Sequence, residues 1–180
     1  MIKLLTAYTF EIDDPKLAER YNAKDVCSKY NSIPPSEREI RKTIIKSLFG
    51  KIGDTFEIYP TFWCDHGKNI EAGENFFMNH GCVILDTEKV KFGNNVLVGP
   101  NCGFYSAGHP IDPVERIAGV EVAKPITIGN DVWIGGNVVV MQGVTIGNNV
   151  VIGAGSVVTK DILSNSIAAG NPCKITRAIV

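Results

Sequence analysis

Residues 125–162 read PITIGNDVWIGGNVVVMQGVTIGNNVVIGAGSVVTKDI, and this stretch decides the fold. A branched apolar residue recurs at every sixth position, and a series of valines with the same spacing runs beside it. The first series comprises Ile128, Ile134, Val140, Ile146, Ile152 and Val158, and the second comprises Val132, Val138, Val144 and Val150. A less regular version precedes this stretch at Ile52, Ile58, Cys64, Ile70, Phe76, Cys82, Phe92, Val98 and Phe104.

A period of six predicts a parallel β-helix built from hexapeptides. An α-helix does not return to one face after six residues, and Gly-Asn and Gly-Gly pairs interrupt any single long strand. Each hexapeptide supplies one short strand and one turn, and three of them make a triangular coil whose recurring apolar residues point to the axis. Glycine and asparagine suit corners that require a positive φ. A β-sandwich, the alternative, would show a period of two and uneven spacing.

The chain is expected to divide into a helical N-terminal segment at residues 1–50 and a β-helix domain at residues 51–180. Asp14-Pro15 predicts the start of a first helix, because proline is favoured at the first helical position. Ser36 and Glu39 match a capping box at the start of a second helix. The apolar face expected for the first helix comprises Leu17, Tyr21, Val26, Cys27 and Tyr30.

The hexapeptide register breaks once, between Ala107 and Pro125. No hexapeptide fits this segment, so a regular coil must extrude it as a loop. Long loops in compact domains usually carry function, and this one begins with Gly108-His109-Pro110. We therefore expect functional residues in the loop at 107–125.

Composition restricts the class of protein. Among 180 residues, 44% are hydrophobic, and 18 basic and 19 acidic residues leave a net charge of -1 without any run of like charge. These values favour a packed core and argue against nucleic acid or an anionic membrane as the partner. Five scattered cysteines without a CxxC motif predict reduced thiols. No signal peptide and no uninterrupted apolar run of membrane-spanning length is found, so we expect a cytoplasmic protein.

Several segments together carry a more specific resemblance than a hexapeptide array does. They are DDPKL, PPSERE, FWCDHGKNIEAGENFFMN, VILD, SAGHPID, the stretch from KPITIG to VVTKDI, and AAGNPCKI. In this order they resemble the galactoside/maltose O-acetyltransferase family along essentially the whole chain. The resemblance implies a left-handed parallel β-helix and a homotrimer with active sites between subunits. It also implies acetyl-CoA as the co-substrate and a small sugar-like acceptor, with neither a metal nor a covalent enzyme intermediate.

Acetyl transfer to a hydroxyl group needs a base for the hydroxyl proton and a donor for the developing oxyanion. Histidine is the usual base, since its ordinary pKa lets it be neutral and basic near pH 7. The resemblance of SAGHPID identifies His109 as that base. A carboxylate is expected to fix the tautomer of this histidine or to help bind the acceptor, and Glu121 on the far side of the loop is the candidate.

Polar residues elsewhere match the acceptor pocket of the family. Asp65, Asn79 and Asp86 occupy matching positions, and Glu11 stands where the family usually has aspartate. Asp and Asn also cap turns in β-helices, which is the structural alternative. His66 and His80 stand where the family commonly has aromatic residues. Together with Glu11, these departures weaken the case for galactoside or maltose itself as the acceptor.

The resemblance places acetyl-CoA along the later coils. Trp133 is expected to form a wall of the pantetheine channel, and the Gly136 amide is expected to donate to the oxyanion. Glycine at this point lets the pantetheine arm lie close to the backbone. Basic groups further along are suited to the phosphates of the coenzyme. The remaining cofactor-binding candidates are Ala154, Thr159, Lys160, Lys174 and Arg177.

Two alternatives of other kinds remain open, and a third, a zinc enzyme, is disfavoured by the spacing of its candidate ligands. Gamma-type carbonic anhydrases share this fold and bind zinc through three histidines that include a closely spaced pair. Here His66, His80 and His109 are far apart in the sequence, and no cysteines have zinc spacing. A non-catalytic hexapeptide scaffold would not need the GHP loop. An acetyltransferase that acts on an amine would keep the histidine and the coenzyme channel and change only the acceptor pocket.

Overall fold

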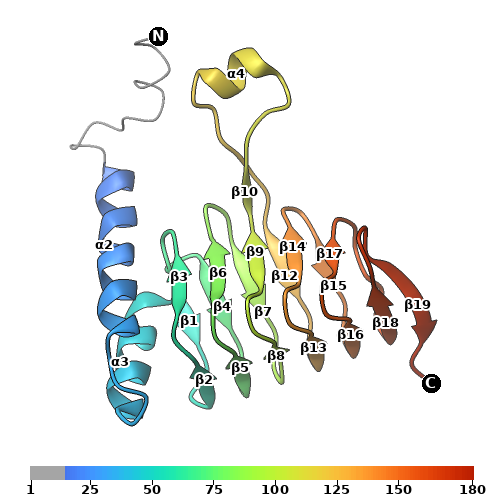
Figure 1. The fold of residues 1–180 in the computed structure, drawn as a ribbon, viewed down its shortest axis with the longest axis horizontal. Coiled ribbons are helices and arrows are strands. Elements are labelled where there is room, and N and C mark those ends of the chain that lie inside the picture. Colours follow the sequence, from blue (N-terminus) through green and yellow to red (C-terminus); the bar gives the residue numbers. More distant parts are fainter. Residues whose placement is uncertain (1–14) are drawn as a thin grey trace.

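The computed structural model describes residues 15–180 and consists of helices that precede a stack of triangular coils (Figure 1). Helix α2 covers Pro15–Asn31 and α3 covers Arg38–Leu48. The short helix α4, at Pro113–Ile117, lies in a loop that projects from the coils. The fold is therefore mainly β, as the period of six predicted.

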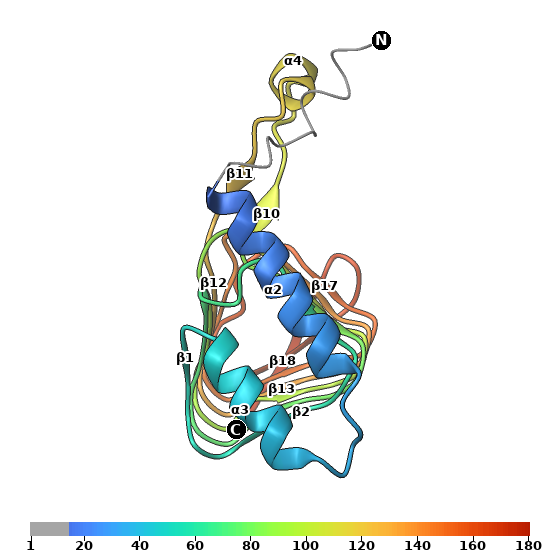
Figure 2. The same cartoon turned by 90° about the vertical axis from the view of Figure 1, so that its left-hand side faces the viewer.

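Three parallel sheets form the three faces of the coils (Figure 2). The first face contains β1 (Lys51–Ile52), β4 (Ile70–Ala72), β7 (Val90–Phe92), β12 (Ile126–Ile128) and β15 (Thr145–Ile146). The second face contains β2 (Phe56–Ile58), β5 (Phe76–Met78), β8 (Leu97–Val98), β13 (Val132–Ile134), β16 (Val150–Ile152), β18 (Ser166–Ala169) and β19 (Lys174–Ala178). The third face contains β3 (Phe62–Cys64), β6 (Cys82–Leu85), β9 (Gly103–Tyr105), β14 (Val139–Met141) and β17 (Val157–Val158). Of these strands, only β19 runs antiparallel to its neighbour.

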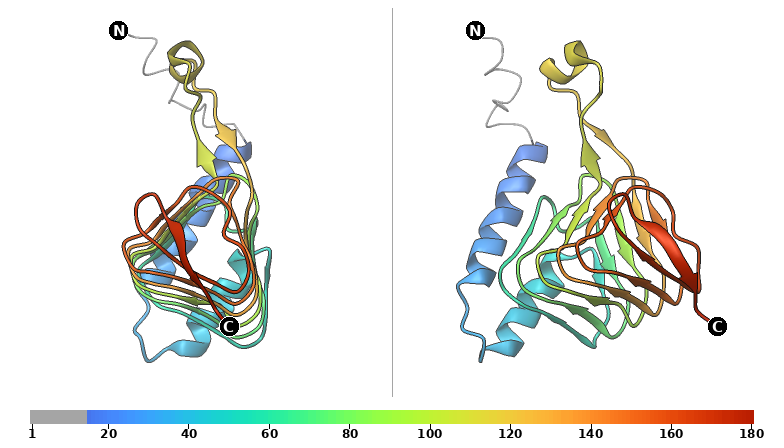
Figure 3. Two further views of the ribbon diagram at one scale, coloured as in Figure 1. Left: turned by 90° about the vertical axis from the view of Figure 1, so that its right-hand side faces the viewer. Right: turned by 45° about the vertical axis from the view of Figure 1, so that its right-hand side comes forward.

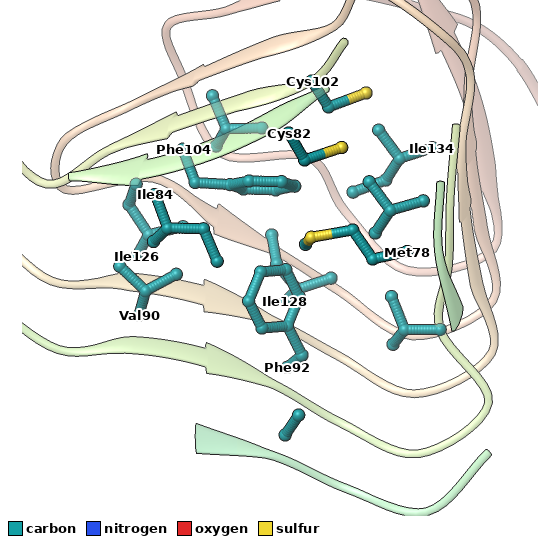
Figure 4. Packing of buried hydrophobic residues seen from close by; sticks show 14 of the residues in the cluster. Met78, Cys82, Ile84, Val90, Phe92, Cys102, Phe104, Ile126, Ile128 and Ile134 are labelled. Carbon is teal, nitrogen blue, oxygen red and sulfur yellow. The ribbon is translucent and has the colours of Figure 1, made fainter. Parts of the chain in front are cut away.

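The recurring apolar residues stack inside the coils and form the core (Figure 4). Every member of the two regular series is at most 2% exposed. Aromatic rings fill the wider early coils, where Phe92 lies 5.0 Å from Phe76 and 4.9 Å from Phe104, measured between ring centroids. All five cysteines are buried and free.

The spacing of six is interrupted at one corner of the early coils. Ile134 pairs with Ile152, three hexapeptides further along the chain, whereas Cys64 pairs with Ile84, two positions beyond that interval. Two additional residues lie in the corner that follows β3. Two more lie in the corner that follows β6. The early series therefore changes to the neighbouring inward position after Cys64, and the prediction of one continuous register was wrong. The displaced members, which are still buried, are Ile70, Phe76 and Cys82.

The corners use asparagine and glycine for different reasons. Asn75, Asn95 and Asn149 have a positive φ, and a side-chain hydrogen bond of 2.8 Å joins Asn75 to Asn95 of the next coil. Gly129 is not among the residues with a positive φ; a Cβ atom there would lie 2.7 Å from the carbonyl carbon of Gly147. Asparagine therefore makes the turn, and glycine permits the coils to stack closely.

Helices α2 and α3 cover the first coil (Figure 2). Asn31 holds the edge of β3 through both its amide group and its carbonyl oxygen, at 3.0 and 2.8 Å from the backbone of Phe62. The buried face of α2 runs through Ala23, Cys27 and Tyr30, whereas Tyr21, expected on that face, is 60% exposed. Tyr21 lies about 200° around the helix from Ala23, since each residue turns by about 100°.

The start of α3 also differs from the prediction. Its N-cap residue is Glu37, and no side-chain hydrogen bond caps it, so Ser36 and Glu39 do not form a capping box. Arg41 is buried on the face of α3 that meets the coils and pairs with Glu57 at 3.0 Å. No helix within residues 15–180 is long and apolar enough to cross a membrane.

Candidate active site

Two surfaces of the coils carry the predicted functional residues. One is a groove on the second face, which we call the second-face groove. The other is the corner between the third and first faces, formed by the turns at residues 65–69 and 86–89 and by the loop at 107–125; we call it the loop corner. The loop corner lies opposite the second face across the triangular section (Figure 2).

An outward row of side chains defines the second-face groove. Residues in register on parallel strands share a face, and the strand pairs align one outward residue from each strand of this sheet. The groove has a volume of about 620 Å³. Its walls include Phe77, Asn79, Leu97, Trp133, Gly136 and Ala154. The complete row comprises Glu57, Phe77, Leu97, Trp133, Val151, Ile167 and Arg177.

The groove is lined mainly by apolar residues, and the outward row continues beyond its lining to the basic residue Arg177. Leu97 and Trp133 are 49% and 57% exposed, although both are large apolar residues. Arg177 follows Trp133 three strands later, or about 14 Å at the usual strand spacing. Such a surface fits the pantetheine arm and phosphates of a coenzyme A molecule. The other basic candidates, Lys160 and Lys174, and also Thr159, are exposed and are not part of the groove wall.

Two glycines bring the groove floor close to the backbone. A Cβ atom on Gly135 would lie 2.6 Å from the amide nitrogen of Ala154, so no larger residue fits there. The neighbouring Gly136 lines the groove. Within residues 15–180, its amide donates to no backbone or side-chain acceptor. This amide is therefore available to a carbonyl oxygen in the groove.

The loop at 107–125 projects from the loop corner (Figure 1). Strands β10 (Ala107–Gly108) and β11 (Val122–Ala123) pair at its base. Asp112 caps α4 by accepting a hydrogen bond of 2.9 Å from the amide of Val114. Arg116 donates to the carbonyl of Pro110 at 3.0 Å. These contacts give the loop a defined internal structure beside the exposed side chain of His109.

The backbone of this loop orients His109. Its Nδ1 lies 3.2 Å from the carbonyl oxygen of Val120. A carbonyl only accepts, so Nδ1 carries the hydrogen and the lone pair of the neutral ring lies on Nε2. The carbonyl of Val120 is thus one partner that fixes the tautomer, and the role of Glu121 towards the histidine or the acceptor stays a prediction.

Glu121 binds Arg20 of α2. Arg20 donates to the two carboxylate oxygens of Glu121 at 3.1 and 3.3 Å. It also donates to Oγ1 of Thr87 at 3.1 Å and to Nε2 of His66 at 3.2 Å. One guanidinium group thus joins a helix, two turns of the coils and the base of the loop.

His66 belongs to this network. Because Nε2 accepts from Arg20, Nδ1 carries the hydrogen and donates to Glu19 at 2.8 Å. Glu19 also pairs with Lys68, and the Lys68 ammonium, with a smaller contribution from His66, holds the pKa of Glu19 below its usual range. His66 is 10% exposed, so it serves chiefly to hold Arg20 and the end of α2 against the coils.

The acceptor candidates have different environments. Asp86 is fully buried, and its Oδ1 accepts from the amides of Asp65 and His66 at 3.0 and 2.9 Å. Burial raises the pKa of the Asp86 carboxyl, and its Oδ2 has no hydrogen-bond partner within residues 15–180. Asp86 therefore shapes the turn that presents Asp65, which is partly exposed. Glu11 lies outside the described residues.

The loop projects from the coils at one corner, away from the second face (Figure 3). The predicted residues of one chain therefore fall into two groups: Asp65, Glu121 and His109 lie at the loop corner, whereas Asn79 and Trp133 lie on the second face. A single chain therefore does not bring the histidine to the groove. Sequence reasoning missed Arg20, Thr87, Phe77 and Leu97. The extra residues in the early repeats could have pointed to the turn that carries Thr87. Counting positions along the strands could have aligned Phe77 and Leu97 with Trp133.

No group of three or more His, Cys, Asp or Glu side chains in the described part of the chain is arranged to hold a metal ion.

Comparisons with known proteins bear on both surfaces. Residues 9–53 match the family described as maltose acetyltransferase hexapeptide capping motif, and residues 125–160 match bacterial transferase hexapeptide (six repeats). The chain is 44% identical to galactoside O-acetyltransferase of Escherichia coli over 89% of this chain and 79% of that protein.

Two solved structures extend this similarity to the fold. A maltose O-acetyltransferase from Clostridium difficile has a TM-score of 0.92 and 44% identity, covering 99% of this chain and 96% of that one. A hexapeptide-repeat acetyltransferase from Vibrio cholerae, complexed with acetyl-CoA, has a TM-score of 0.89 and 36% identity, covering 99% of this chain and 97% of that one. The similarity covers the groove, the loop and the helices alike.

Proposed function

Because the chain belongs to the galactoside/maltose O-acetyltransferase family of hexapeptide-repeat acyltransferases, we propose that it moves the acetyl group of acetyl-CoA to a hydroxyl group of a sugar or related polyol. The protein is an acetyltransferase that uses acetyl-CoA. The proposal concerns the acceptor, the residues that act and the assembly in which they meet.

The geometry of His109 carries this proposal. The Val120 carbonyl places the lone pair of the ring on Nε2, which can take the proton of an attacking hydroxyl group. The side chain is exposed at the base of the loop, beside the polar residues of the loop corner. The proton taken from the hydroxyl is then passed to the departing thiol, so the reaction needs no covalent intermediate with the protein.

The second-face groove is suited to the other substrate. A thioester is an activated acyl donor, which is the chemistry that acetyl-CoA supplies when bound. Trp133 and Leu97 offer apolar contact to the pantetheine arm, and Arg177 lies where it can meet phosphates. The Gly136 amide is in position to donate to the thioester carbonyl oxygen, which becomes more negative as the hydroxyl attacks.

A complete site requires a second copy of the chain, because His109 and the groove lie on opposite sides of one chain. We infer that the protein forms a homotrimer in which the loop corner of one subunit faces the second-face groove of the next. The exposed apolar side chains of the loop support this inference, since Ile111 and Val114 are 95% and 74% exposed. Exposed apolar residues that are grouped in this way commonly mark an interface.

The test measures thiol release from acetyl-CoA with a panel of sugars, amino sugars and amines. We expect a sugar to stimulate release, and we expect His109→Ala to reduce kcat/KM by about 100-fold or more. Glu115→Gln is the matched control, because Glu115 lies in the same loop on the exposed helix α4. Mass spectrometry of the product identifies the acetylated group.

Three results would count against the proposal. If amines were acetylated in preference to sugars, the acceptor would be an amine and not a sugar hydroxyl group. Full activity in His109→Ala would remove the base from the mechanism. A monomer in sedimentation analysis that is fully active would exclude a site shared between copies.

A further inference from the structure

A second hollow adjoins the groove and has no part in the reaction described above. It lies between the turn that joins α2 to α3 and the first strands of the second face, and its volume is about 870 Å³. Phe77 lines both this hollow, which we call the helix-side pocket, and the second-face groove. The walls of the helix-side pocket include Arg38, Arg41, Glu57, Tyr59, Phe77 and His80.

The pocket wall carries an excess of positive charge. Glu57 pairs with both Arg38 and Arg41, so two guanidinium groups share one carboxylate. Arg41 is only 4% exposed, and its Nε has no hydrogen-bond partner within the described residues. Its other nitrogens donate to Glu57 and to the carbonyls of Pro35 and Ile58, so Arg41 is held in place and the excess positive charge lies at Arg38, which shares the same carboxylate and favours an anion nearby.

Arg38 offers the donors that such an anion needs. Its Nε contacts Glu57, which orients the guanidinium group. Among residues 15–180, its two terminal amino groups have no partner, and the side chain is 56% exposed. A planar guanidinium with two parallel donors matches a carboxylate.

The opposite wall is aromatic. The rings of Tyr59 and His80 are stacked, with centroids 4.9 Å apart and an interplanar angle of 21°. The rings of Tyr59 and Phe77 are edge-on to each other, with their centroids 5.5 Å apart. Nδ1 of His80 donates to the carbonyl of Pro60, so the neutral ring has its acceptor at Nε2. Arg41 lies over the Tyr59 ring, 6.0 Å from its centroid, so the stacked pair offers a ligand the outer face of the exposed His80 ring and the edge of Tyr59, which suit the face of a sugar ring and its hydroxyl groups.

The two hollows lie close enough for one ligand to reach both. Asn79 lines the second-face groove, and the next residue, His80, lines the helix-side pocket. Consecutive Cα atoms are about 3.8 Å apart, which is less than the length of one sugar ring. A ligand whose first ring is acetylated near Asn79 can therefore place its second ring on Tyr59 and His80.

We propose that the helix-side pocket binds the second ring of an acidic disaccharide or longer glycoside, with a carboxylate of that ring on Arg38. This inference rests on the proposed sugar acetylation, and it narrows the acceptor to one that carries a negative charge away from the acetylated ring. It also gives a reason for the histidine at position 80, whose ring forms half of the stacking surface.

Direct binding tests the pocket without depending on turnover. Isothermal titration of the full-length protein compares cellobiouronic acid with cellobiose, which has the same two rings without the carboxylate. We expect the acid to bind about fivefold to tenfold more tightly. Arg38→Gln should remove that preference, and His80→Ala should weaken the binding of both sugars. Lys46→Gln, which removes one positive charge from the same helix outside the pocket, is the matched control.

Each outcome separates this inference from the proposed function. Equal affinity for the two disaccharides, a preference that survives in Arg38→Gln, or complete displacement of the acid by an equal concentration of inorganic phosphate would overturn the pocket assignment. Sugar acetylation could then still stand on monosaccharide acceptors. Conversely, binding of the acid that depends on Arg38, without any acetyl ester detected by mass spectrometry, would retain the site and refute the proposed acceptor chemistry.

Discussion

The later coils, at residues 125–160, and the loop corner are built from the same repeat but are used differently. In the later coils β12, β13 and β14 each pair with the strand three hexapeptides further along the chain, and the outward residues form a continuous row. At the loop corner, additional residues follow β3 and β6, and the loop of residues 107–125 follows β9. Regular stacking thus makes a long uniform groove, whereas departures from it make a cluster of polar side chains.

Polar networks in a repeat protein form where the repeat is interrupted. In a strict hexapeptide every residue either stacks on the next coil or forms the turn, so none is free to join a network such as that of Arg20, His66 and Thr87. The additional residues in a longer turn can do so. Asp86 then supports the widened turn from inside the core, with two backbone amides on one carboxylate oxygen.

The largest expected effect comes from breaking the regular stack. Gly135→Ala should lower the free energy of unfolding by about 2–3 kcal/mol, because its Cβ would lie 2.6 Å from the Ala154 amide nitrogen. Gly155→Asn is the control, since Gly155 has a φ of +72° that asparagine tolerates and no atom within 4 Å of an added Cβ. Thermal denaturation measures both. Equal stability of the two variants would contradict the close-stacking argument.

Breaking the support of the loop corner should have the next largest effect. Asp86→Ala leaves two amides without an acceptor and should cost about 2 kcal/mol of stability. Asp86→Asn keeps an acceptor and removes the buried charge, so it should cost less. Because folding raises the pKa of this carboxyl, the native protein loses stability as pH rises through the interval above about 3.9, the ordinary value. Asp86→Asn should lack that loss in denaturation curves recorded from pH 3 upward.

A third variant tests the groove without touching the stack. Trp133→Ala should raise KM for acetyl-CoA by about tenfold, because the exposed indole is proposed to contact the pantetheine arm. Stability should change little, since the ring is 57% exposed. Trp63→Ala, which removes a 40% exposed tryptophan from the third face, should leave KM for acetyl-CoA unchanged. Steady-state kinetics would refute the assignment if both variants behaved alike.

The smallest effect concerns the ion pair that fastens the loop. Arg20 and Glu121 are both partly exposed, so a double-mutant cycle with Arg20→Gln and Glu121→Gln should show a coupling of about 0.5 kcal/mol. The coupling should shrink in high salt. Additive effects of the two substitutions at low salt would show that the contact does not fasten the loop.

Sequence reasoning predicted the repeat better than the site. The regular series of isoleucine and valine allowed ten inward residues of the later coils to be named, but not Ile126, Ser156 or Ile162, and His109 was identified by its resemblance to the family. The contact between His109 and the carbonyl of Val120 was not predicted, because the partner of a histidine within hydrogen-bond distance depends on how a loop folds. The role of Arg20 was not predicted, because its partners lie far away in the sequence, on the turns of the coils and at the base of the loop.

The period of six is enough to specify the β-helix, since it leaves no other way to bury two residues of every hexapeptide along a common axis. The sequence by itself also determined the extruded loop, because the stack cannot absorb a segment without that period. Only the tertiary structure decided that the groove and His109 lie on opposite sides of one chain, and that Asp86 is buried while Thr87 meets Arg20. Those outcomes depend on corner geometry and on contacts between distant segments, which local pattern does not encode.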